Sequence, residues 1–182
     1  IPVVLVDPHR SVGSTPQLIR TIADAVGKPD AGEALVKRTQ EQIDQAKKQI
    51  AAWKPAKPMR VAFLYVRGNA GVFFILGSEN GASELIQGVG ADDVASDKGI
   101  TTLVPANAES LVSINPDAIF VMRDGLASTG GMKGLLARAG VANTTAGRKQ
   151  RVISIPDGIS LSFGPQTGEV LTAVAKALYG VK

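Results

Sequence analysis

The stretch Arg60-Val61-Ala62-Phe63-Leu64-Tyr65-Val66-Arg67-Gly68 decides the fold. Residues 60–66 predict a β-strand, because β-branched and aromatic side chains dominate and a glycine follows. Both alternating sets of side chains are apolar: Val61, Phe63 and Tyr65 on one face, and Ala62, Leu64 and Val66 on the other. A strand that is apolar on both faces is typical of the centre of a parallel sheet with helices on both sides.

Strands and helices alternate on the carboxyl side of this stretch. A glycine-rich loop follows it, and the patterns then predict helices near 80–88, 108–114, 131–139 and 166–179. They also predict strands at 117–122 and 152–155 and a short strand at 100–103. Residues 59–182 are therefore expected to form an α/β three-layer sandwich with a mostly parallel central sheet.

Two helices are expected on the amino side. Residues 1–6 predict a short buried strand, and a first helix starts near Thr15 and ends at Gly27. Residues 30–53 predict a longer helix with a narrow apolar stripe, which the proline-rich stretch 54–58 ends. The stripe also fits a coiled-coil seam, but we favour a rod that lies along a globular body.

Composition excludes several classes of protein. The 182 residues are 45% hydrophobic and 20% charged, which is typical of a globular chain, and no apolar run is long enough to span a membrane. Because cysteine is absent, disulfides, thiolate metal sites and cysteine nucleophiles are excluded. His9 is the only histidine, so a catalytic histidine pair within this chain is excluded as well.

The charge is uneven but carries no nucleic-acid signature. The net charge is +4, and residues 1–60 hold ten Lys/Arg against six Asp/Glu. These basic residues are spread along predicted helices, as on a solvated face, and no recognition motif accompanies them, so no nucleic-acid partner is expected. The chain opens inside a predicted strand without a leader, and we expect that a targeting segment has been removed.

The best candidate site lies where the predicted strands end, because ligands of open α/β sheets bind beyond the carboxyl ends of the strands. Two of these ends carry an Asp-Gly pair, Asp124-Gly125 and Asp157-Gly158, for which turn formation is the simpler interpretation. At the third end, Tyr65 and Arg67 point to the same side. A guanidinium beside a phenol favours the phenolate, and tyrosine can hold haem iron.

The spacing of Tyr65 and Arg67 alone does not decide between a ligand pair and a half-buried tyrosine beside a solvated arginine. An enzyme is the less favoured reading. The chain has no phosphate-binding P-loop and no candidate triad, and Gly88-Val89-Gly90 lacks the third glycine of a dinucleotide loop.

Several motifs together resemble a known family. They are the Arg60–Gly68 stretch, Gly77-Ser78-Glu79-Asn80-Gly81, Gly88-Val89-Gly90-Ala91, Ala108-Glu109-Ser110-Leu111, Asn115-Pro116-Asp117-Ala118-Ile119 and Arg151-Val152. The chain resembles the cluster III substrate-binding proteins of ABC importers over nearly its whole length. Within that family, Phe63-Leu64-Tyr65-Val66-Arg67-Gly68 is most similar to the haem-binding, HmuT-type branch.

The resemblance implies a bilobal protein of which this chain is the C-terminal half. Residues 1–14 would be the remnant of the N-terminal lobe, which is otherwise missing. Residues 15–58 would hold the helices, including the long connecting helix and linker, and residues 59–182 the C-terminal α/β lobe. The implied location is extracytoplasmic, in the periplasm or lipid-anchored at the cell surface.

The resemblance also implies roles for single residues. Tyr65 would bind the iron of haem, and Arg67 would hydrogen-bond its phenolate oxygen. Glu79 would dock into the ABC transporter permease. Haem is flat and mostly apolar, so Met122 and Phe163 are candidate contacts, with core packing as the alternative role for each. Arg123 would pair with a propionate, because a guanidinium suits a carboxylate.

The implied function is a haem carrier that delivers its ligand to an ABC importer, and not an enzyme. A second histidine ligand would come from the missing lobe, since His9 is expected at the surface. A ferric-siderophore or cobalamin carrier on the same fold is the alternative. Because one haem face would be uncovered, we also expect a haem-linked homodimer of this chain.

Overall fold

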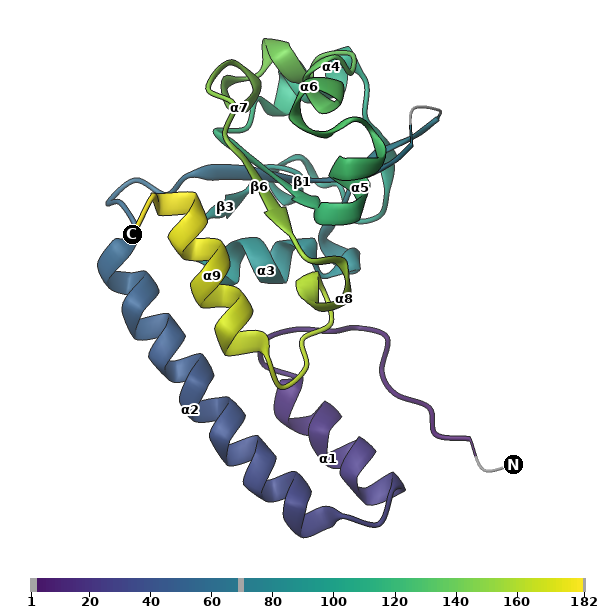
Figure 1. The fold of residues 1–182 in the computed structure, drawn as a ribbon, viewed down its shortest axis with the longest axis vertical. Coiled ribbons are helices and arrows are strands. Elements are labelled where there is room, and N and C mark those ends of the chain that lie inside the picture. Colours follow the sequence, from purple (N-terminus) through teal and green to yellow (C-terminus); the bar gives the residue numbers. More distant parts are fainter. Residues whose placement is uncertain (1–2, 69–70, 182) are drawn as a thin grey trace.

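The computed structural model describes residues 3–68 and 71–181. Figure 1 shows an α/β body with a hairpin of two helices along one side, α1 (Thr15–Ala25) and α2 (Pro29–Trp53). The described helices include none that is both long and apolar enough to cross a membrane.

The sheet is built around β1 (Arg60–Arg67), as its two apolar faces predict. On one side β1 pairs in parallel with β5 (Ala118–Met122), which pairs in parallel with β6 (Val152–Ile155). On the other side it pairs antiparallel with β2 (Val72–Ile75), which pairs with β4 (Val104–Pro105). The short β3 (Asp92–Asp93) adds a further parallel pairing. The order is β4-β2-β1-β5-β6, and the predicted mostly parallel sheet is confirmed.

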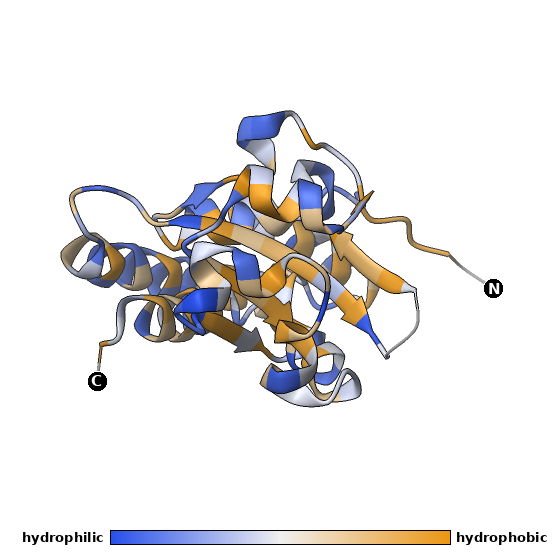
Figure 2. Ribbon diagram, turned by 90° about the horizontal axis from the view of Figure 1, so that it is seen from above, coloured by the Kyte–Doolittle hydropathy of each residue, from blue (hydrophilic) through white to orange (hydrophobic). Residues whose placement is uncertain are grey.

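Successive side chains of each strand point to opposite faces of the sheet, so the sheet has one hydrophobic core on each face. Phe63 and Phe120 meet edge to face on the first, with ring centroids 6.4 Å apart, beneath α3 (Ala82–Gly88) and α9 (Thr167–Tyr179). Leu64 and Ile119 lie in the second core, which α4 (Ala108–Ile114) and α6 (Gly131–Leu136) cover. Figure 2 shows the apolar strands between these helical layers, so the three-layer sandwich is confirmed.

The long helix α2 is the predicted rod along a globular body. Its N-terminal half packs against α1 and its C-terminal half against α9, and Figure 1 shows α2 and α9 side by side. Its buried stripe contains Val36, Thr39, Ile43, Ala46 and Ile50. An apolar stripe that meets neighbouring helices of the same chain supplies the burial that stabilises a long helix.

The remaining elements are short. They are α5 (Arg123–Ser128), α7 (Thr145–Arg148), α8 (Asp157–Ser160), and the 3₁₀ helices η1 (Ser78–Asn80), η2 (Ser96–Lys98) and η3 (Val141–Asn143).

Three sequence predictions are wrong in detail. Of the strand expected at residues 1–6, residues 1–2 lie outside the described part of the chain, and residues 3–6 form no strand. Val3 and Leu5 are 78% and 88% exposed, because no described strand lies beside them to complete a ladder. The strand expected at 100–103 lies instead at β4, where Val104 pairs with Ile75. The expected glycine-rich loop contains β2, whose four residues gain their backbone partners only by folding back on β1.

Candidate functional site

The candidate site lies where β1, β5 and β6 end at the same edge of the sheet. Because these strands are parallel, their last residues come together: Arg67 on β1, Met122 on β5 and Ile155 on β6. Tyr65 is half-buried on the face of the first core, and its partner across the β1–β2 pair is Phe74. The edge therefore offers a phenol beside an aromatic ring and a thioether.

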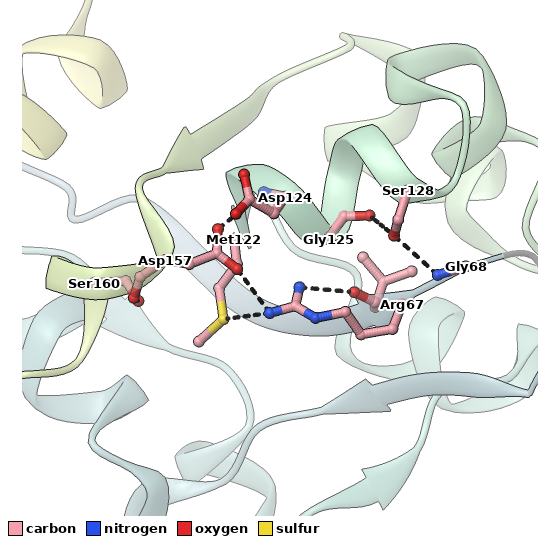
Figure 3. Close-up of polar contacts among 9 residues, drawn as sticks. Arg67, Gly68, Met122, Asp124, Gly125, Ser128, Asp157 and Ser160 are labelled. Atoms are coloured by element: carbon pink, nitrogen blue, oxygen red, sulfur yellow. Dashed lines mark hydrogen bonds and ion pairs between the residues drawn. The ribbon is translucent and has the colours of Figure 1, made fainter.

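Arg67 lies on the same side of β1 as Tyr65, as predicted. Its guanidinium carbon is 4.9 Å from the centroid of the Tyr65 ring, a cation–π contact. Figure 3 shows the polar partners of the guanidinium. Nη2 donates to Asp157 Oδ1 at 2.7 Å and to Met122 Sδ at 3.6 Å, and Nη1 donates to the Val66 carbonyl at 3.2 Å. The arginine is thus held by Met122 at the end of β5 and by Asp157 just after β6.

The two tyrosines of the chain differ in their hydroxyl groups. Tyr179 donates to the Val89 carbonyl at 2.7 Å, and burial, with a smaller contribution from Asp92, raises its pKa above the ordinary value. The hydroxyl of Tyr65 has no hydrogen-bond partner among residues 3–68 and 71–181. Tyr65 is therefore the tyrosine whose oxygen is free to meet a ligand.

Gly68, directly after Arg67, is anchored by both its backbone N–H and its carbonyl. The Gly68 N–H donates to Ser128 Oγ at 2.8 Å, and that hydroxyl donates to the Gly125 carbonyl at 2.7 Å. Arg138 donates to the Gly68 carbonyl, and its guanidinium carbon lies 5.1 Å from the centroid of the Phe73 ring. The end of β1, and with it Tyr65 and Arg67, is fixed by the neighbouring α5 and by Arg138.

The other residues expected near haem are divided. Met122 contacts Arg67 directly. Arg123 is exposed at the start of α5 and lines a groove of about 470 Å³ beside Ile155, and Tyr65 lies outside that groove. Phe163 is 4% exposed and belongs to the first core, where it lies against Gly81, so its placement favours the packing role.

The remaining predicted residues lie at the surface. Glu79 is exposed on η1, whose backbone is held by a bond from the Glu79 N–H to the Thr101 carbonyl at 2.8 Å. The His9 side chain is 77% exposed, with Nδ1 3.2 Å from Asp7 Oδ1. The described residues contain no group of three or more His, Cys, Asp or Glu that could hold a metal ion.

Sequence reasoning missed Asp157 and Gly125 as parts of the site. Asp157 binds Arg67, and Gly125 packs against the same guanidinium. The available signal was the Asp-Gly pair after each of two strands, for which turn formation was the simpler interpretation. Only the assembled sheet edge shows that one of these carboxylates faces Arg67.

In open α/β sheets, ligands bind at this edge, beyond the carboxyl ends of the strands. The sequence profile of the periplasmic binding protein family matches residues 1–158, and the chain belongs to that family. The family's extracytoplasmic location agrees with the location expected from the resemblance. No curated protein matches the chain.

Solved structures agree with this assignment. The chain is similar to the haem-binding protein HmuT, with 47% identity and a TM-score of 0.94 over 97% of this chain and 57% of HmuT. It is similar to the periplasmic haem-binding protein RhuT from Roseiflexus sp. RS-1 in its apo form, with 35% identity and a TM-score of 0.88 over 93% of this chain and 64% of RhuT.

A third similar structure is the periplasmic haem-binding protein BhuT in complex with two haems, with 31% identity and a TM-score of 0.84 over 96% of this chain and 64% of BhuT. The chain therefore spans less than two thirds of the length of each of these three proteins.

Proposed function

We propose that this chain is the C-terminal lobe and connecting helix of a haem-binding component of an ABC importer, and that it binds haem through Tyr65. One observation carries the proposal: the ring of Tyr65, whose hydroxyl bonds none of the described residues, lies under Arg67 at the edge of the sheet where β1, β5 and β6 end. Solved variants of HmuT replace, one at a time, a tyrosine and an arginine two positions apart, which is the spacing of Tyr65 and Arg67.

The chemistry of these side chains suits ferric haem. A phenolate is an anionic oxygen ligand that tyrosine supplies to haem iron in other proteins. A neighbouring guanidinium stabilises that charge, which is the role we assign to Arg67. Phe74 and Met122 border Tyr65 and Arg67, where they offer apolar contact to a porphyrin. Arg123, exposed at the same edge, is our candidate partner for a propionate.

Haem is a transported ligand in this proposal, and the chain acts as a carrier without catalysis. Carriers of ferric siderophores and of cobalamin share the family fold, and they are the competing readings. HmuT, RhuT and BhuT are haem-binding proteins, and the similarity of the chain to them favours haem over these alternatives.

The test is a titration of the purified chain with ferric haem, followed by absorption spectroscopy. We expect saturable binding with an Fe(III)–phenolate band, and Tyr65→Phe should lose that band. Tyr179→Phe is the matched control, because it removes the hydroxyl that is bonded to the Val89 carbonyl. A Tyr65→Phe spectrum identical to that of the parent would refute the ligand assignment, and tighter binding of a ferric siderophore or cobalamin would refute haem as the ligand.

We also propose that Glu79 docks the lobe onto the permease, in an importer whose binding protein is periplasmic or lipid-anchored. Its exposure on η1 supports the proposal. Glu79→Lys should abolish co-purification of the haem-loaded protein with its permease. Glu109→Lys, at another exposed glutamate near the start of α4, should leave it intact. Equal retention by both variants would contradict the docking role.

A further inference from the structure

One carboxylate joins all three strand ends at the candidate site. Asp157 is the first residue of α8, directly after β6 and its Pro156 link. Its Oδ1 accepts from Arg67 Nη2 at 2.7 Å, and its Oδ2 accepts from the Asp124 backbone N–H at 2.9 Å. Figure 3 shows the side chain pointing toward Arg67 and Asp124. A turn residue needs neither of these contacts, which both reach across the sheet.

Gly125 closes the other side of the guanidinium. A Cβ atom at this position would lie 2.4 Å from Arg67 Nη1 and 2.5 Å from the Val66 carbonyl oxygen. Gly125 is buried inside α5 and has no positive φ, so its backbone conformation would accept alanine. The absence of a side chain is therefore required by the guanidinium and the β1 backbone, which occupy that space.

These contacts leave part of the guanidinium for a further partner. Arginine has five N–H donors in a fixed plane. Asp157, Met122 and the Val66 carbonyl engage the Nη1 and Nη2 groups, and within residues 3–68 and 71–181 no acceptor bonds Nε. The same plane lies over the Tyr65 ring. An arginine that is held in place before the ligand arrives loses less rotamer freedom on binding than a free one.

We infer that Asp157 and Gly125 are positioning residues that fix Arg67 over Tyr65 and thereby strengthen ligand binding. The inference rests on the proposed function. Asp157 acts by its carboxylate, which orients the guanidinium through Nη2. Gly125 acts by leaving space for Nη1. Neither residue contacts the Tyr65 hydroxyl, so both act through Arg67.

The chain offers a matched control for each change. Asp157→Asn removes the charge at the guanidinium, and Glu109→Gln removes an exposed carboxylate on α4 to which no role in the candidate site is assigned. Gly125→Ala fills the space beside Nη1, whereas Gly158→Ala adds the same methyl to the other Asp-Gly pair, where no atom lies within 4 Å.

The experiment is a ferric-haem titration of the full chain and these four variants, each also made in an Arg67→Ala background. Asp157→Asn and Gly125→Ala should each weaken binding by roughly tenfold, the scale of one charge-assisted hydrogen bond, and diminish the phenolate band. The two controls should bind like the parent. With Arg67 replaced, neither Asp157→Asn nor Gly125→Ala should weaken binding further, because nothing remains to be positioned.

Three results would overturn the inference. The first is that Asp157→Asn binds haem as tightly as the parent. The second is that Asp157→Asn weakens haem binding equally in the parent and in the Arg67→Ala background, because this would mark a purely structural role. Should Gly125→Ala fail to fold, as judged by circular dichroism, Asp157→Asn still decides. The third is that the parent chain does not bind haem, which would overturn the proposed function as well. If the parent chain binds haem and Asp157→Asn binds it equally well, only this inference fails.

Discussion

The hydroxyl of Thr39 gives the sharpest stability prediction. Thr39 lies in the buried stripe of α2, is 1% exposed, and its Oγ1 has no hydrogen-bond partner among the described residues. In the unfolded chain that hydroxyl bonds water. Folding removes it from water without a replacement bond, so the hydroxyl opposes the packing of α2.

Thr39→Val exchanges the hydroxyl for a methyl group of similar size. Removing an unsatisfied buried hydroxyl recovers about 1–3 kcal/mol, and the added methyl contributes up to about 0.8 kcal/mol. Threonine and valine have similar helix propensities, so the backbone adds little. We expect a net gain of about 1–4 kcal/mol, which corresponds to a rise of about 2–16 °C in Tm for a domain of this size.

Urea unfolding followed by circular dichroism measures the change. Thr39→Ser is the control, since it keeps the hydroxyl, loses the methyl and should cost about 1 kcal/mol. A Thr39→Val protein that is less stable than the parent would mean that the hydroxyl is satisfied in the folded chain, which would contradict this prediction.

Three further predictions concern packing, pH and assembly. Gly168→Ala should destabilise the chain by about 1–2 kcal/mol in urea unfolding, because a Cβ there would lie 2.7 Å from the Gln42 carbonyl carbon. This overpacking outweighs the gain in helix propensity. Unchanged stability would contradict the close contact of α2 and α9. Burial raises the pKa of Tyr179, so with rising pH this phenol ionises first in the unfolded chain. Its contribution to stability should therefore be intact below about pH 10 and fall above it. In pH-dependent thermal melts Tyr179→Phe should show a smaller fall in stability, and an equal fall would contradict the assignment. Haem should convert the chain from monomer to dimer in sedimentation velocity, and Tyr65→Phe should prevent it; a monomer at saturating haem would exclude the haem-linked dimer.

Local sequence patterns predict the parts of this fold that local physics decides. The apolar faces of residues 60–66 predict a central strand, and the apolar stripe of α2 predicts a long packed helix. In both cases the positions of the buried side chains repeat with the period of the element, two residues for the strand and about 3.6 for the helix. The pattern cannot predict β2, whose four residues are stabilised by pairing with β1. It cannot place β3 either, since two residues carry no period.

The candidate site also has one part that the sequence predicts and one part that it does not. Alternation along one strand places Tyr65 and Arg67 on one side, and the 4.9 Å contact agrees with it. The bond from Arg67 to Asp157 joins residues 90 positions apart, so no local pattern contains it. Gly125 matters for what its missing side chain leaves open, which is visible only when α5 lies against the guanidinium.

The absorption spectrum of the purified chain after addition of one equivalent of ferric haem tests the central claim most directly. We expect saturable binding with an Fe(III)–phenolate band that Tyr65→Phe abolishes and Tyr179→Phe retains. A spectrum of free haem, or a bound spectrum that is the same in the parent and in Tyr65→Phe, would contradict it.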